Sequence, residues 1–82
     1  MGTRDKFGAD YREVVRRLVD RRTAAGLTQT DLAVAVGTDQ SQISKFERGE
    51  RRIDIIDYVR ICRAIGVDPG VPLRGLKLRQ KK

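Results

Sequence analysis

Residues 27–49 read LTQTDLAVAVGTDQSQISKFERG and contain the signals of two short helices in succession. Thr28 can offer its hydroxyl to the first unpaired amides of a helix, and Asp31 can reach back to complete a capping box. Gly37 can end that helix, because glycine adopts the left-handed backbone conformation that other residues avoid. The stretch therefore predicts a helix over residues 29–36 with a very short turn after it.

The helix expected next, over residues 40–48, is unusually polar. Asp39 is a suitable N-cap for it. Only Ile43 and Phe46 are of the type that is normally buried. The side chains left to face outward are Gln40, Ser41, Gln42, Ser44 and Lys45. A helix with this composition is not built mainly for the core, so its outer face is the candidate functional surface.

Further helices are predicted on both sides of this pair. Apolar residues recur at three- and four-residue steps from Asp10 to Gly26, which indicates an amphipathic helix with Arg16 and Arg17 on its solvent face. Asp54 caps a helix that is apolar around most of its circumference, and its expected core residues are Ile55, Tyr58, Val59, Ile61, Cys62 and Ile65. The segment after it is limited to a turn or a single ragged helical turn by Gly70, Pro72 and Gly75. Strand-like alternation is absent, so we predict a compact all-α fold of four to five helices.

The length of the chain, 82 residues, suits one compact domain. We place it at residues 10–73, between a flexible N-terminal arm over 1–9 and a basic C-terminal tail over 74–82. The arm mixes glycines and charges with one aromatic residue, and the tail carries five positive charges and no acid. Eighteen Lys and Arg against eleven Asp and Glu give a net charge of +7. An anionic partner is therefore expected, with nucleic acid as the first candidate.

Composition argues against several classes of function. The sequence has no histidine and a single cysteine, Cys62, which removes disulfides, Cys/His zinc sites and histidine-based catalytic triads. Cys62 lies in an apolar helical run and is interpreted as a small core residue rather than a reactive thiol. No nucleophile and base stand at motif spacing and no glycine-rich loop could cradle a phosphate, so we expect no enzyme, no metal and no cofactor. The sequence shows neither a signal peptide nor an apolar stretch near the ~20 residues of a membrane span, so we expect a cytoplasmic location and no membrane partner.

The two central helices and the turn between them have the sequence form of a DNA-reading helix-turn-helix. Such a motif needs a small residue where its helices cross, a glycine in the turn and anchors under the second helix. Ala33 meets the first demand and Gly37 the second, while the anchors are Ile43 and Phe46. We therefore expect the second helix to enter the major groove of DNA.

The same stretch resembles the Cro/repressor-type helix-turn-helix transcriptional regulators of the XRE family. Their common string runs close to L-T-Q-x-x-L-A-x-x-x-G and, a few residues later, Q-S-x-I-S-x-x-E-x-G. The residues that match it are Leu27, Thr28, Gln29, Leu32, Ala33, Gly37, Gln40, Ser41, Ile43, Ser44, Glu47 and Gly49. The resemblance extends from about Tyr11 to Pro69. It implies a repressor-type fold and a sequence-specific regulator, of repressor or controller type, that binds a palindromic operator in double-stranded DNA as a homodimer.

The resemblance also implies roles for individual side chains. Those expected to contact base edges are Gln40, Ser41 and Lys45, and the chemistry agrees because glutamine suits adenine and lysine suits guanine. Those expected to contact the DNA backbone are Gln29, Thr28, Gln42, Ser44, Arg48, Arg51 and Arg52. Gln29 is also expected to brace Gln40. Arg22 and Glu47 occupy positions where the family often has a buried ion pair.

The sequence departs from the family pattern in two places. Asp39 puts a carboxylate at the N-terminus of the second helix, where Ser or Thr is commoner. This charge repels phosphate and would narrow the set of acceptable sites. The final helix, which in many relatives completes the core and helps form the dimer, is interrupted here by Gly70, Pro72 and Gly75.

One alternative function remains open on the sequence. An antitoxin would neutralise a toxin protein as its main task and use the same helix-turn-helix for autoregulation. A long apolar or disordered extension for the toxin would favour this alternative, and only the short basic tail is available. A restriction-modification controller or a small phage-type repressor fits the leading interpretation.

Overall fold

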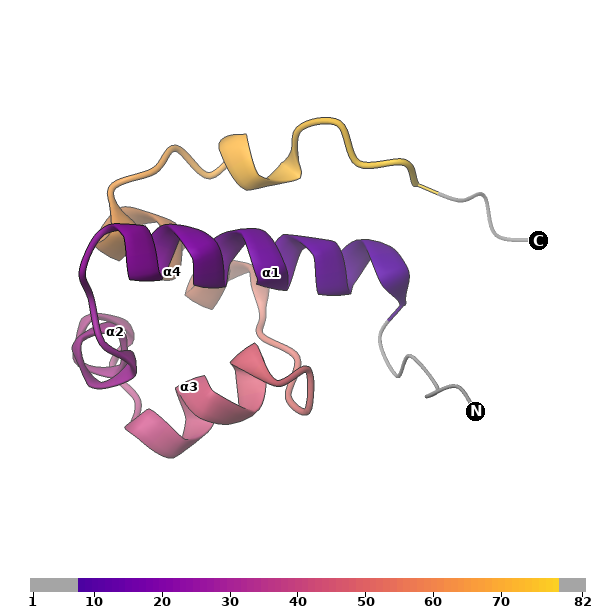
Figure 1. Cartoon of the computed structure of the whole chain (residues 1–82). Coiled ribbons are helices and arrows are strands. Elements are labelled where there is room, and N and C mark those ends of the chain that lie inside the picture. Colours follow the sequence, from indigo (N-terminus) through magenta and orange to yellow (C-terminus); the bar gives the residue numbers. More distant parts are fainter. Residues whose placement is uncertain (1–7, 79–82) are drawn as a thin grey trace.

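The computed structural model describes residues 8–78, and this part of the chain is entirely helical and irregular, without strands (Figure 1). Its α-helices are α1 (Ala9–Ala24), α2 (Gln29–Val36), α3 (Gln40–Glu47) and α4 (Ile55–Ile65), and a 3₁₀ turn, η1 (Val71–Leu73), follows. The predicted all-α fold is confirmed. Residues 1–7 of the predicted arm and 79–82 of the predicted tail lie outside the described residues, so the three-part division of the chain remains a prediction.

The central helices begin at the predicted caps. The Thr28 hydroxyl accepts a hydrogen bond from the Asp31 N–H at 3.0 Å, and the Asp31 carboxylate accepts one from the Thr28 N–H at 2.8 Å. Gly37 has a φ of 89°, the left-handed conformation expected at the end of α2. Helix α3 ends at Glu47, so Arg48 is its C-cap rather than its last helical residue.

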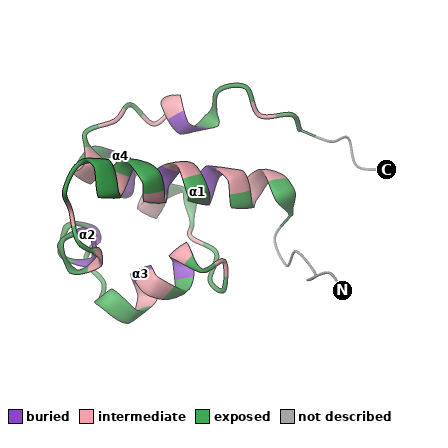
Figure 2. Cartoon of the chain, in the orientation of Figure 1, coloured by how far each residue is buried: buried purple, intermediate pink, exposed green. Residues whose placement is uncertain are grey.

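The core forms where the four α-helices meet (Figure 2). Its buried side chains are Val14, Val15 and Leu18 of α1, Leu32, Ala33 and Val36 of α2, Ile43 and Phe46 of α3, and Ile61 and Cys62 of α4. Fully burying a large apolar side chain stabilises the fold by roughly 1.5–3 kcal/mol. Because Ile43 and Phe46 are the buried residues of α3, only one side of this helix packs against the core. Burial also raises the pKa of the Cys62 thiol, as expected for a core cysteine.

The prediction that Ile55 belongs to the core is wrong. Its side chain is 75% exposed, although it shares a face of α4 with Cys62 two turns later. Only the C-terminal half of α4 carries buried residues, Ile61 and Cys62. The first turn of α4 therefore extends past the packed core, and Ile55 reaches the surface there.

The interpretation of Arg17 as a solvated side chain is also wrong. Its Nη1 donates to the carbonyl oxygens of Pro72 at 2.9 Å and Arg74 at 2.7 Å, and its Nε donates to Glu13 at 2.9 Å. The C-terminal segment runs back along α1 (Figure 1). Because η1 is a single short turn, the carbonyl groups at its end lack hydrogen-bond partners within the helix. Arg17 supplies those partners and fastens η1 to α1. Leu76, in the segment predicted as tail, packs against the core.

Candidate nucleic-acid interface

The outward side of α3 carries the residues that the sequence predicts as base contacts. Gln40, Ser41 and Lys45 are exposed, and Gln42 and Ser44 are partly buried beside them. With 3.6 residues per turn, the three exposed side chains fall on one side of the helix and the two buried anchors on the other. In Figure 1, α3 lies on the opposite side of α1 from η1, so this surface faces away from the C-terminal segment.

A shielded ion pair links α1 to the end of α3. Arg22 Nε and Nη2 donate to the two carboxylate oxygens of Glu47 at 2.7 and 3.0 Å. Their side chains are only 11% and 7% exposed. Arg22 Nη1 also donates to the Leu27 carbonyl oxygen at 2.6 Å, between α1 and α2. A bidentate pair with so little access to water positions α3 more firmly than a surface pair does.

Glu47 in turn orients a glutamine side chain. Gln29 Nε2 donates to Glu47 Oε1 at 2.9 Å. Because an ionised carboxylate only accepts, the amide nitrogen of Gln29 must face Glu47 and its oxygen must face away. Gln40 Nε2 donates to that oxygen at 2.6 Å. A continuous hydrogen-bond chain thus runs from Arg22 through Glu47 and Gln29 to Gln40.

This hydrogen-bond chain determines which hydrogen-bonding groups Gln40 can offer to a base. One amide hydrogen of Gln40 is used in the bond to Gln29. The second hydrogen and Oε1 remain available on an exposed side chain. A donor next to an acceptor is the pattern that pairs bidentately with the major-groove edge of adenine.

Asp39 organises the first turn of α3. Its Oδ1 accepts from the Ser41 hydroxyl at 2.7 Å and from the Gln42 backbone N–H at 3.0 Å. The bond from Ser41, then the bond from Gln42 and the charge of Lys45, lower the pKa of the Asp39 carboxyl below its ordinary value. Asp39 is therefore ionised at neutral pH at the exposed start of α3.

Arg48 is held by side chains of its own segment. Its Nε and Nη2 donate to the two carboxylate oxygens of Glu50 at 3.1 and 3.0 Å, and its Nη1 donates to the Ser44 hydroxyl. A phosphate would have to compete with Glu50 for this guanidinium, a point that the sequence reasoning missed. The signal was present, since Arg48 and Glu50 carry opposite charges on the two sides of Gly49.

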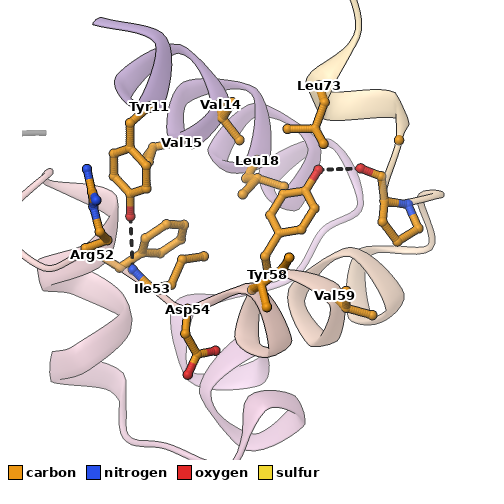
Figure 3. A pocket seen from close by; sticks show the side chains of 14 residues that line it. Tyr11, Val14, Val15, Leu18, Arg52, Ile53, Asp54, Tyr58, Val59 and Leu73 are labelled. Carbon is orange, nitrogen blue, oxygen red and sulfur yellow. Dashed lines mark hydrogen bonds between the residues drawn. The ribbon is translucent and has the colours of Figure 1, made fainter. Parts of the chain in front are cut away.

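The structure places the other predicted backbone contacts in different surroundings. Arg51 is exposed in the loop after α3. The guanidinium carbon of Arg52 lies 5.2 Å from the centroid of the Tyr11 ring, beside an apolar groove (Figure 3). Thr28 is the N-cap of α2, where its oxygen accepts one bond and its hydroxyl hydrogen can still donate.

The apolar groove lies between α1, α4 and η1 and has a volume of about 630 Å³. Tyr11 and Tyr58 both line it, each with its hydroxyl bonded to the backbone (Figure 3). Ile55 and Leu73 border it and are 75% and 46% exposed. Within residues 8–78 no cluster of three or more potential metal ligands forms, and no helix has the length and apolar character of a membrane span.

Comparison with known proteins adds independent evidence. Residues 18–71, more than half of the chain, match the Helix-turn-helix family. The chain is 33% identical over 67 residues to y4wC, an uncharacterized HTH-type transcriptional regulator of Sinorhizobium fredii. That match covers 82% of the chain but 47% of the relative, so the chain spans about half the length of this protein.

Two solved structures are similar in both fold and sequence. An XRE-family like protein from Pseudomonas syringae has a TM-score of 0.75 and 43% identity, with 82% of each chain covered. The restriction-modification controller protein C.AhdI from Aeromonas hydrophila has a TM-score of 0.69 and 33% identity, over 78% of this chain and 91% of its own. The resemblance found in the sequence is thereby confirmed: this chain belongs to the XRE-type helix-turn-helix family of DNA-binding regulators.

Proposed function

We propose that this chain is a sequence-specific DNA-binding transcriptional regulator that reads the major groove with α3. The observation that carries the proposal is the hydrogen-bond chain from the Arg22–Glu47 pair through Gln29 to Gln40. It positions an exposed amide before DNA arrives, so less conformational entropy is lost on binding. Folding alone does not require such an arrangement, since Gln40 itself is exposed.

The proposed contacts fall into two groups. On base edges, Gln40 pairs with adenine, Lys45 donates to guanine, and Ser41 contacts a further base. The backbone contacts come from Gln29, Thr28, Gln42, Ser44, Arg48, Arg51 and Arg52. The net charge of +7 favours DNA of any sequence, so specificity has to come from the first group.

We propose regulation of the repressor or controller type, in which the protein acts by occupying promoter DNA in the cytoplasm. The similarity to the controller protein C.AhdI supports this, because the match covers 91% of that small protein. No feature of the described residues or of the comparisons favours the antitoxin alternative.

The functional proposal is tested by selection from a randomised pool of DNA duplexes. The protein is expected to enrich a palindromic sequence and to bind it at least ~10³-fold more tightly than a scrambled duplex. Affinity for both duplexes should fall as the salt concentration rises. Equal affinity for all duplexes would indicate non-specific binding only and would contradict the proposal.

We also propose that the chain forms a homodimer through the apolar groove between α1, α4 and η1. Ile55 and Leu73 border the groove, and the neighbouring Ile56 is 55% exposed. A patch of exposed apolar side chains on a small soluble domain commonly marks a contact surface. A two-fold dimer would place two α3 helices on half-sites about one helical turn, ~34 Å, apart.

Replacing Ile55 by lysine is expected to weaken this dimer at least about tenfold, because the interface would have to bury an unpaired charge. Sedimentation velocity over a range of protein concentrations measures the effect. Val34→Lys is the matched control, since Val34 is 77% exposed on α2 and does not line the groove. A chain that stays monomeric at high concentration, even on a palindromic duplex, would refute the dimer.

A further inference from the structure

The hydroxyl hydrogen of Ser41 is already used in a hydrogen bond within the protein. A serine hydroxyl has one hydrogen to donate and lone pairs that accept. Ser41 donates its hydrogen to Asp39 Oδ1 at 2.7 Å. The side that Ser41 presents to the surroundings is therefore an acceptor, and both residues are exposed at the start of α3.

We propose that Asp39 sets the base preference at the position that Ser41 contacts, by holding the Ser41 hydroxyl as an acceptor so that it selects adenine or cytosine. This inference rests on the proposed function, in which α3 reads the major groove. On the contacted strand, adenine and cytosine present an amino group there, N6 or N4, that can donate to Ser41. Guanine and thymine present O6 and O4 at the equivalent place, and two acceptors repel one another.

Reversing the hydroxyl to donate to guanine or thymine carries a cost. The bond to an ionised carboxylate is charge-assisted and about twice as strong as a neutral one. Rotating the Ser41 hydroxyl would also remove one hydrogen bond from the Asp39 carboxylate and leave that carboxylate close to another acceptor, the Ser41 oxygen. Asp39 remains bonded to the Gln42 N–H at 3.0 Å, so its carboxylate stays in place at the start of α3.

The two leading residues of α3 thus make different demands on DNA. Gln40 offers a donor and an acceptor together, because Gln29 occupies only one of its amide hydrogens. Ser41 offers an acceptor alone, because Asp39 occupies its one hydrogen. A Ser or Thr hydroxyl at position 39 could donate as well as accept, so it would not fix the polarity of Ser41 in this way.

The test is duplex selection followed by titration with single-base variants of the preferred site, using Ser41→Ala, Asp39→Gly and the unmodified protein. Ser41→Ala is expected to remove the preference at one position of each half-site, which identifies the base that Ser41 contacts. The unmodified protein should prefer adenine or cytosine there over guanine or thymine by about tenfold. Asp39→Gly should bring that ratio close to one, because the released hydroxyl can then donate or accept. Glycine is also a tolerated N-cap, so α3 should persist.

Two further variants separate the hydrogen bond from charge and capping. Asp54→Gly removes the same kind of N-cap from α4, where the carboxylate accepts from the Asp57 N–H at 2.8 Å, and should leave the base preference unchanged. Asp39→Asn keeps an Oδ1 that can accept from Ser41 and should keep the order of preference. Base preference is the readout, so an equal change in affinity for all duplexes has no influence on it.

The inference fails if Ser41→Ala alters no position, if guanine or thymine is preferred there, or if Asp39→Gly leaves the ratio unchanged. It also fails if Asp39→Asn abolishes the preference as fully as Asp39→Gly, because charge rather than the hydroxyl bond would then be responsible. An unmodified protein that enriches no sequence would instead overturn the proposed function. The two failures are therefore distinguishable.

Discussion

Replacing Glu47 by alanine is expected to lower the free energy of unfolding by roughly 3 to 5 kcal/mol. The Arg22 guanidinium, 11% exposed, would lose the carboxylate that accepts two of its hydrogen bonds. Removing one partner of a buried pair is costly because the desolvation of the remaining charge is no longer offset. In a domain of this size each kcal/mol shifts Tm by about 4–8 °C, so Tm should fall by more than about 10 °C in thermal melting.

Two controls isolate the effect of burial. Asp20→Ala removes a carboxylate that lies 2.7 Å from Arg16 but is 62% exposed, and its expected cost is below about 1 kcal/mol. The double variant Arg22→Met/Glu47→Leu removes both charges together and should regain most of the lost stability. It cannot restore the bond from Gln29 to Glu47, so it separates stability from DNA recognition. A Tm of Glu47→Ala within error of the unmodified protein would show that the pair is solvated.

Replacing Gln40 or Lys45 by alanine is expected to reduce sequence preference more than general affinity. Each lost base contact should cost roughly 1 to 3 kcal/mol on the preferred operator and much less on random DNA. This corresponds to about a 5- to 150-fold loss of specific affinity. Binding isotherms on operator and scrambled duplexes measure both quantities.

Replacing Arg51 or Arg52 by alanine is the matched comparison for these variants. Loss of a phosphate contact should weaken binding to both duplexes about equally and flatten the dependence of log affinity on log salt by about one unit of slope. A salt series on the two duplexes should therefore sort the four residues into two groups. If Gln40→Ala and Arg51→Ala behaved identically on both duplexes, α3 could not be the helix that reads the major groove.

The helix boundaries were predictable because their signals are local. The capping box of Thr28 and Asp31, the Asp39 cap and the left-handed Gly37 all act within a few residues of chain. Apolar spacing then indicates which side of each helix packs. The family motif adds the crossing of α2 and α3, which is why the sequence is sufficient to assign the outward side of α3.

Local patterns do not tell which distant segment covers a side chain. Ile55 has the residue type and helical position of a core residue, yet α4 extends past the packed elements and leaves it 75% exposed. Arg17 has the spacing of a solvated side chain, yet it binds carbonyl groups 55 and 57 positions later in the chain. Both errors arise because burial depends on where the distant elements lie, and local spacing does not give their positions.

The hydrogen-bond chain of the candidate site depends on both the sequence and the tertiary structure. The sequence by itself determined the residue types at positions 22, 29, 40 and 47 and, through the family motif, their expected proximity. Only the packing of α1, α2 and α3 decided the direction of each bond. With Glu47 shielded beside Arg22, its carboxylate accepts from Gln29, and that bond orients Gln29 to accept from Gln40. The pattern that Gln40 offers to DNA is therefore a property of the tertiary structure, because an acceptor-only group buried in the fold fixes the orientation of the amides above it.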